Sequence, residues 1–171
     1  YNKAFNLFCI PDKGLDRVSF IKLDETTGKL TLDGFAKFPD GSGPSHMAIH
    51  PSGAYAFVVG ELNSSLYRSS FDLQNGHLQI DDKYISNRGH DSIAKINIDP
   101  NSGNRLEILW QKTGGSTPRF ITMDEVGKSL LVANEASDSI FSLSLNSFSS
   151  SEPFQLAHTG SPVCIVFKKG N

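Results

Sequence analysis

The sequence of 171 residues has few cysteines and no long apolar run. With 2 cysteines, it predicts neither a disulfide-rich scaffold nor a zinc site built from paired cysteines. No stretch approaches the roughly 18 apolar residues of a membrane-spanning helix, and no basic-then-apolar signal segment opens the chain. Cys9 and Cys164 both lie in apolar strand patterns. This favours buried, reduced thiols and a cytoplasmic protein, with a disulfide between the two as the alternative.

Charge of one sign is also scarce. The formal net charge is −2, so no general attraction to nucleic acid or to an anionic membrane surface is expected. No segment shows a sustained helical period of 3.6 with capping residues, and no helix of consequence is predicted. What remains is alternation of apolar and polar residues with Gly, Asn and Asp at the corners, which is typical of an all-β protein.

A strand–turn–strand pattern recurs along the chain. In its two clearest copies Asn87 corresponds to Asn134 and Asp91 to Asp138, each 47 residues apart. A repeat of this length that is made only of short strands is typical of β-propeller blades. The copies are residues 84–99, 131–145, 57–66 and 8–18.

Each full repeat is expected to hold four strands, a to d. The first repeat lacks strand a. The third lacks one strand, because Ile93 follows Leu66 at a much shorter interval than Ile140 follows Ile93. The expected strands are 5–10, 17–24 and one from Leu30 in the first repeat; 45–50, 55–60, 65–72 and 77–80 in the second; 83–86, 92–99 and 105–111 in the third; 119–123, 129–133, 139–145 and 153–157 in the fourth; and a lone strand 163–167.

Repeats of this number and length predict an all-β propeller of about four blades, one of them lacking a strand, as a single domain over residues 1–171. Propellers carry about 4–8 blades, so either the chain is part of a larger ring or its ring closes unusually. One closure is that the strand 163–167 supplies the strand a missing from the first repeat. Open strand edges instead favour association into a homodimer.

The segment Ser86-Asn-Arg-Gly-His-Asp-Ser-Ile93 resembles the lactonase family of seven-bladed propellers, which includes propeller-type 6-phosphogluconolactonases and fungal carboxymuconate lactonizing enzymes. The resemblance extends over essentially the whole chain and corresponds to the C-terminal half of such a protein. Its further motifs are Gly43-Pro44-Ser45-His46, Gly60-Glu61-Leu62, Pro118-Arg119-Phe120, Val132-Ala133-Asn134 and Pro162-Val163-Cys164.

The resemblance implies opening or closing of an anionic lactone ring. No His/Cys spacing suggests zinc, and neither a metal nor a cofactor is expected. In the family a His, two Arg and a Glu lie at one mouth of the central channel. Glu61 matches that glutamate and Arg88 resembles the later arginine, so these two are the candidate catalytic residues. Ser45 stands where the family motif has its earlier arginine, and the family's histidine is expected in an earlier repeat, before Tyr1.

Further candidates for substrate binding are Arg119, His46 and His90. Arg119 follows Pro118 at the start of an inner strand, just as Ser45 follows Pro44, so the repeat places it at the same channel mouth. Each candidate has a structural alternative, because a carboxylate can bond its own turn and a histidine can make a local hydrogen bond. The corner aspartates are expected only to make turns; they are Asp16, Asp91 and Asp138.

Two functions therefore stay open. The first is hydrolysis of 6-phosphogluconolactone or a similar anionic lactone, with Glu61 transferring the proton or orienting water and with Arg88 and Arg119 holding the anion. The expected partner is a small anionic lactone or a sugar phosphate. The second is a non-catalytic relative that binds an anionic ligand or a protein partner, which Ser45 and the missing histidine favour.

Overall fold

The structure is a computed structural model that describes residues 1–3, 5–72, 74–85 and 90–168, with the backbone alone for 82–85. These residues form β-strands and no helix, as the all-β prediction requires. No helix among them could therefore cross a membrane.

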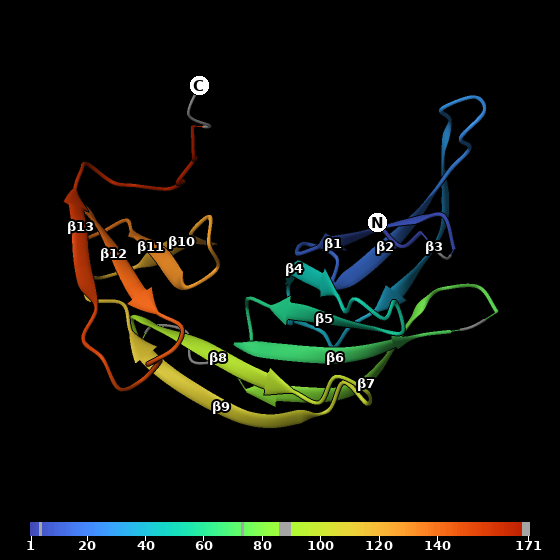
Figure 1. The fold of residues 1–171 in the computed structure, drawn as a ribbon. Helices are drawn as coiled ribbons and strands as arrows, with labels where there is room; N and C mark the ends of the chain where they lie inside the picture. Colours follow the sequence, from blue (N-terminus) through green and yellow to red (C-terminus); the bar gives the residue numbers. More distant parts are fainter. Residues whose placement is uncertain (4, 73, 86–89, 169–171) are drawn as a thin grey trace. The chain divides into compact units, whose positions relative to one another are not determined.

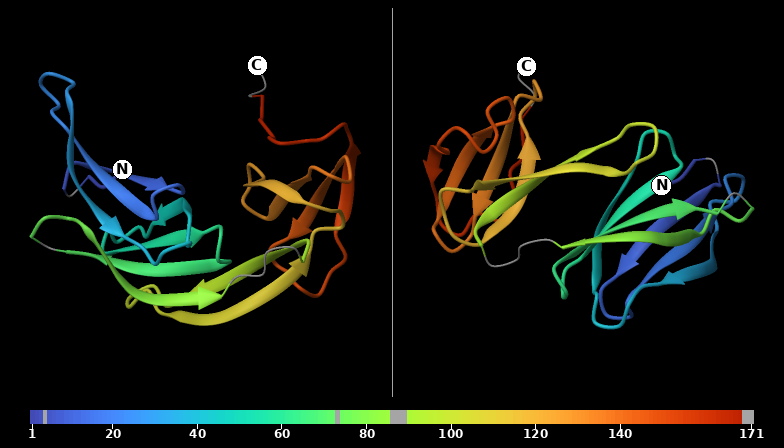
Figure 2. Two further views of the ribbon diagram at one scale, coloured as in Figure 1. Left: turned by 180° about the vertical axis from the view of Figure 1, so that it is seen from behind. Right: turned by 90° about the horizontal axis from the view of Figure 1, so that it is seen from below.

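Four antiparallel sheets follow one another along the chain, each with its strands in sequence order (Figure 1). Figure 2 shows the same sheets from two other directions. The sheets are β1 (Leu7–Asp12), β2 (Arg17–Leu23) and β3 (Leu30–Lys37); β4 (Pro44–Ile49), β5 (Tyr55–Gly60), β6 (Ser65–Phe71) and β7 (Leu78–Ile85); β8 (Ser92–Ile98) and β9 (Arg105–Lys112); and β10 (Pro118–Met123), β11 (Ser129–Asn134), β12 (Ser139–Ser144) and β13 (Phe154–His158).

The chain divides into two compact units, Tyr1–Ser86 and Asn87–Asn171, each of which contains two sheets. The expected single domain over residues 1–171 stays a prediction.

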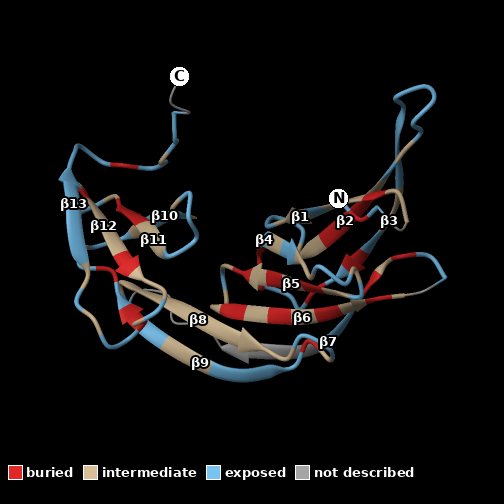
Figure 3. Cartoon of the chain, in the orientation of Figure 1, coloured by how far each residue is buried: buried red, intermediate tan, exposed pale blue. Residues whose placement is uncertain are grey.

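The core of the first unit lies between its two sheets. Buried and partly exposed side chains alternate along β5 and β6 (Figure 3), so one face of that sheet carries the core. Phe38 packs edge to face on Tyr67, with ring centroids 5.2 Å apart. The buried apolar residues are Leu7, Val18, Phe20, Ala36 and Phe38 from the first sheet, with Ala56, Val58, Tyr67, Phe71 and Leu78 from the second.

The core of the second unit is smaller. Ile93 and Leu109, from the two-stranded sheet, pack on a buried cluster that includes Val132. On β10, Ile121 pairs with Val132 and so lies on the same face of its sheet. Yet Ile121 is 47% and Met123 is 58% exposed. We attribute this exposure to the small size of the β8–β9 sheet, which has only these two strands in the described part of the chain and so leaves β10 partly uncovered.

The corner aspartates make turns, as predicted. Asp16, Asp91 and Asp138 have φ of 48°, 49° and 53°, in the left-handed region that Asp tolerates. Each carboxylate also accepts a hydrogen bond from the segment that follows the outer strand of its own sheet. These bonds run from Gly43 N–H to Asp16 Oδ1 at 2.7 Å, from Thr117 N–H to Asp91 Oδ1 at 2.8 Å and from Ser161 N–H to Asp138 Oδ1 at 2.7 Å.

The strand count predicted for the third repeat is wrong. The expected separate strands 77–80 and 83–86 are one strand, β7, over Leu78–Ile85, which pairs with β6 from Phe71↔Leu78 to Ser65↔Ile85. The third sheet therefore has two strands in the described part of the chain, and lacks both a and b.

The spacing of the strands explains this result. In the second sheet strand a begins at Pro44 and strand c at Ser65, and in the fourth sheet they begin at Pro118 and Ser139, at the same separation. The interval from Leu66 to Ile93 falls short of the full repeat by almost that separation. The missing length is thus an inner a–b hairpin, not a single strand.

The expected strand 163–167 is also wrong. The described residues of this segment have no strand pairing, and Val166 is 85% exposed. The closure in which a strand 163–167 completes the first repeat therefore has no such strand to supply.

The buried ring of Phe20 provides a test of the first unit's core. Phe20 is 0% exposed and stacks on the His77 ring at a centroid distance of 4.3 Å. Phe20→Ala should lower the free energy of unfolding by about 3–5 kcal/mol, measured by urea denaturation. Leu32→Ala, at a position 60% exposed on β3, should change it by no more than about 0.5 kcal/mol. Equal effects would contradict this core.

Asp16 makes the stability depend on pH. Hydrogen bonds from Gly43 and Gly41 hold the pKa of the Asp16 carboxyl below its ordinary value. Because the folded pKa is the lowered one, the stabilisation is present above the unfolded pKa of about 3.9 and is lost as the pH falls through the folded pKa. Asp16→Ala should lower the melting temperature at neutral pH. When the pH falls below about 4, the melting temperature of this variant should drop by less than that of the wild type. Asp40→Ala, at a carboxylate 86% exposed, should behave like the wild type.

Candidate functional site

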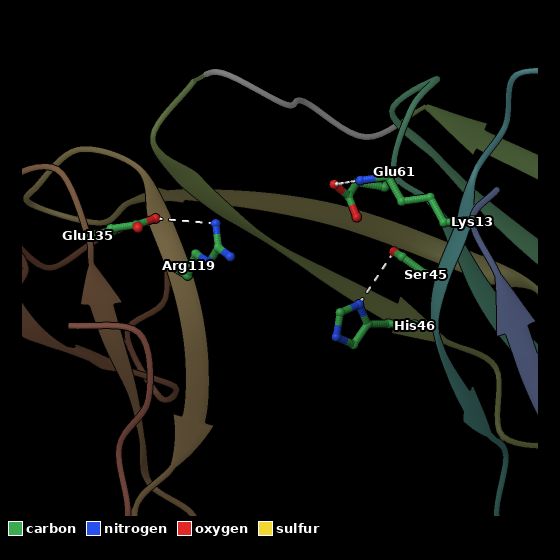
Figure 4. A network of polar contacts seen from close by, with 6 residues as sticks. All are labelled: Lys13, Ser45, His46, Glu61, Arg119 and Glu135. Atoms are coloured by element: carbon green, nitrogen blue, oxygen red, sulfur yellow. Dashed lines mark hydrogen bonds and ion pairs between the residues drawn. The ribbon is translucent and has the colours of Figure 1, made fainter. Parts of the chain in front are cut away.

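Glu61 lies at a hydrogen-bonded corner directly after β5. Its backbone N–H donates to the Gly43 carbonyl at 2.9 Å, and the next N–H, of Leu62, donates to the Ser42 carbonyl at 3.1 Å. Its side-chain Oε1 lies 2.6 Å from Nζ of Lys13, and Figure 4 shows this pair. The two side chains are 32% and 47% exposed, so a charged pair lies where solvent and ligand can reach it.

Ser45 and His46 begin the inner strand of the same sheet. The pairing of β4 with β5 shifts between Pro44 and His46, which makes Ser45 the bulged residue. His46 is exposed, with its Nδ1 3.4 Å from Ser45 Oγ (Figure 4). Bulges of this kind often re-aim a side chain next to an active site.

A cavity of about 390 Å³ lies beside this strand, within the first unit. Burial raises the pKa of the Cys9 thiol, one of its lining groups, so that this cysteine stays protonated and is a poor nucleophile at neutral pH. The lining includes Cys9 and Pro11 from β1 and Ser45, His46, Met47 and Ile49 from β4.

The second unit repeats the corner of Glu61. Glu135 follows β11, and its backbone N–H donates to the Thr117 carbonyl at 2.9 Å. Arg119 is the bulged residue at the start of β10. Its Nη1 lies 3.4 Å from Glu135 Oε2, and the guanidinium side chain is 61% exposed (Figure 4). Glu135 follows Glu61 at the same interval at which Arg119 follows Ser45.

The remaining candidates are Arg88 and His90. Arg88 lies outside the described residues. His90 is exposed, its Nδ1 lies 3.0 Å from Ser92 Oγ and its carbonyl accepts a hydrogen bond from Lys112 Nζ at 2.8 Å. These local bonds agree with the structural alternative for His90, and a substrate contact stays a prediction.

The first unit thus brings together Glu61, Ser45 and His46, and the second brings Arg119 beside Glu135. Lys13 and Glu135 were not among the residues predicted from the sequence. Each lies three residues before a corner residue of left-handed φ: Lys13 before Asp16, and Glu135 before Asp138. That shared position would have identified them. Among residues 1–3, 5–72, 74–85 and 90–168, no three His, Cys, Asp or Glu side chains gather in a way that could hold a metal ion.

Comparison with known families decides the assignment. The sequence matches the family described as "Lactonase, 7-bladed beta-propeller" over residues 4–83 and 77–167. The chain belongs to this family. The two matched segments overlap over residues 77–83, which begin just before β7 and continue into it. The third repeat is shortened at this place. The predicted fold class, an all-β propeller with about four blades in this chain, is confirmed.

Relatives and solved structures agree with this family. The chain is 28% identical over 161 residues to the 6-phosphogluconolactonase of Bacillus subtilis, covering 79% of this chain and 46% of that protein. It spans about half the length of the curated relatives it matches. Its fold is similar to that of a putative 6-phosphogluconolactonase from Bacteroides uniformis, with a TM-score of 0.82 at 19% identity, covering 96% of this chain and 55% of the other. It also resembles the Pseudomonas aeruginosa periplasmic gluconolactonase, with a TM-score of 0.79 at 20% identity, covering 94% and 53% of the two chains.

The candidate side chains should contribute little to folding. Because the Lys13–Glu61 and Arg119–Glu135 pairs are exposed, Glu61→Gln and Arg119→Ala should each change the free energy of unfolding by less than about 1 kcal/mol. Arg68→Ala is the contrast, since Arg68 is 11% exposed and lies 2.6 Å from Asp81. It should cost roughly 2 kcal/mol or more. Urea denaturation of the three variants measures this, and a large loss for Glu61→Gln would contradict an exposed, functional role.

Proposed function

We propose that this chain is a lactonase that hydrolyses 6-phosphogluconolactone or a related lactone with an anionic substituent. One observation carries the proposal. In a chain of the lactonase family, the Glu61 carboxylate is held at a hydrogen-bonded corner, partly exposed, beside an ammonium group. The same corner adjoins the start of β4, which lines a cavity.

Lactone hydrolysis needs a base and a means of holding the substrate. Water attacks the carbonyl carbon, the ring C–O bond breaks, and the products are a carboxylate and a hydroxyl group. Glu61 is proposed to take the proton from the attacking water, a role that suits a carboxylate. The leaving ring oxygen takes that proton back from Glu61, and the carboxylic acid that forms releases its own proton to the solvent. The reaction uses water and side chains of the protein and requires no cofactor.

The basic residues are proposed to bind the anionic group of the substrate. Arg88 and Arg119 carry planar guanidinium groups that can hold a phosphate or carboxylate through two hydrogen bonds. Exposure supports this role for Arg119, whose side chain is 61% exposed and makes a long contact of 3.4 Å to Glu135. His46 and His90 are proposed as further substrate contacts, because both rings are exposed.

Several relatives support this substrate class. The curated Bacillus subtilis relative is named a 6-phosphogluconolactonase, and the Pseudomonas aeruginosa structure is a gluconolactonase. We also propose a cytoplasmic location, on the ground that Cys9 and Cys164 are both free thiols.

The second candidate is a propeller that binds an anionic ligand or a protein partner without turnover. One observation favours it. Ser45, not an arginine, occupies the bulge at the start of β4. A homodimer is part of this proposal, since β8 pairs only with β9 in the part of the chain that the structure describes.

A lactone-hydrolysis assay on the purified 171-residue protein tests the first candidate. Turnover of 6-phosphogluconolactone should exceed the spontaneous rate, and Glu61→Gln should lower kcat by roughly 100-fold or more. Arg88→Ala and Arg119→Ala should raise KM. Glu25→Gln, at an exposed carboxylate in the β2–β3 loop, is the matched control and should keep wild-type rates.

Equal rates in the wild type, the Glu61→Gln variant and the buffer would exclude the enzyme. The binding protein would then be favoured if 6-phosphogluconate raised the melting temperature of the wild type, since a ligand that binds only the folded state stabilises it.

A further inference from the structure

Lys13 projects from the β1–β2 turn toward the corner of Glu61. The turn itself is ordered, because the Asp12 carboxylate accepts hydrogen bonds from the N–H groups of Gly14 and Leu15, both at 3.2 Å. The ammonium group that it presents lies 2.6 Å from Glu61 Oε1, and its side chain is 47% exposed. The hydrogen-bonded β1–β2 turn thus places the flexible Lys13 side chain in the candidate site.

The pair with Glu61 leaves this cation available to a ligand. An ammonium group has three N–H donors and one of them suffices for Glu61. An exposed ion pair also contributes little to stability, so that a second anion can share the ammonium at small cost. The other cation of this turn, Arg17, is placed differently. Its Nε lies 3.8 Å from Asp12 Oδ2 and its guanidinium lies over the Phe35 ring.

Charge explains why a shared cation matters here. An anionic substrate beside the Glu61 carboxylate would be repelled by the like charge. A cation bound to both groups removes this repulsion and draws the anionic substituent toward the carboxylate. A neutral lactone has no group for that interaction and gains nothing from Lys13.

We propose that Lys13 is a substrate-binding residue that selects lactones carrying a phosphate or carboxylate group over neutral lactones. The inference rests on the proposed lactonase function and adds to it the residue that recognises the anion in the first unit. Glu61 then acts on the attacking water, and Lys13 binds the anionic substituent of the lactone.

The test compares a phosphorylated sugar lactone with its unphosphorylated counterpart. Lys13→Met should lower kcat/KM for the phosphorylated lactone by roughly tenfold or more, the loss of one hydrogen bond to a charged group, mainly through KM. For the neutral lactone the value should change less than about twofold. Lys13→Arg should restore most of the selectivity. Lys22→Met is the matched control, since Lys22 is a 54% exposed lysine paired with Asp33 at 2.7 Å.

Unchanged selectivity in Lys13→Met, or an equal loss in Lys22→Met, would overturn the inference while leaving the lactonase function intact. If the wild type hydrolyses neither lactone, the proposed function fails and melting temperatures decide the role of Lys13. A rise with glucose 6-phosphate but not with neutral glucose, lost in Lys13→Met, supports it. No rise in the wild type, or the same rise in both proteins, overturns it.

Discussion

The hydrogen bond from the Gly43 N–H to the Asp16 carboxylate joins the two sheets of the first unit at the place where the candidate site lies. Asp16 closes the β1–β2 corner, Gly43 leads into β4, and the Gly43 carbonyl accepts the N–H of Glu61. Gly43 has φ of 57°, and a Cβ on it would lie 2.5 Å from the Leu62 side chain, so glycine is required. The chain of bonds fixes the β1–β2 turn, and with it Lys13, relative to Glu61.

The second unit is built on the same bonds. Asp91 accepts from the Thr117 N–H, and the Thr117 carbonyl accepts from the N–H of Glu135. Thr117 also has φ of 57°, a conformation that is costly for a residue with a Cβ and that the bonds on both sides must hold. These bonds are kept although the third repeat lacks its a–b hairpin, because the residues that make them lie outside the missing segment. The step from the last residue of a d strand to the first residue of the next strand has the same length at Ile85–Ser92 as at Lys37–Pro44.

Much of the fold could be predicted from the sequence because strands and corners are local features. Alternation with period two located most strands to within about two residues, and an aspartate before the c strands β2, β8 and β12 marked their corners, while Ser64 stands at that position before β6. The errors concern partners that are distant in sequence. Residues 83–86 match a b strand in the 47-residue repeat, yet 82–85 continue β7 because β6 offers them a pairing edge. Residues 163–167 alternate like a strand but pair with no strand in the described part of the chain. Pattern gives the tendency to extend, and a partner decides the sheet.

The candidate site was less predictable for a related reason. Glu61 could be matched by motif, while its partner Lys13 belongs to a different sheet and is 48 residues away. The repeat nevertheless holds the information. The position three residues before the corner residue is occupied in turn by Lys13, Glu61, Arg88 and Glu135, so that basic and acidic residues alternate from one repeat to the next.

Backbone hydrogen bonds hold the fold and side chains define the site, so that the same arrangement of strands can present different functional residues. Ser45 and Arg119 occupy the same bulge at the start of an inner strand, after Pro44 and Pro118. The hydrogen bonds that hold the two bulges come from backbone groups and corner aspartates, and neither depends on the residue in the bulge. A hydroxyl group can therefore replace a guanidinium at this position without disturbing the sheet. Because stability is set by the corners and the buried faces, the residues around them can change the charge of the site at little cost to folding. A cation lost from one strand can then be supplied from a neighbouring turn, which is the position that Lys13 occupies.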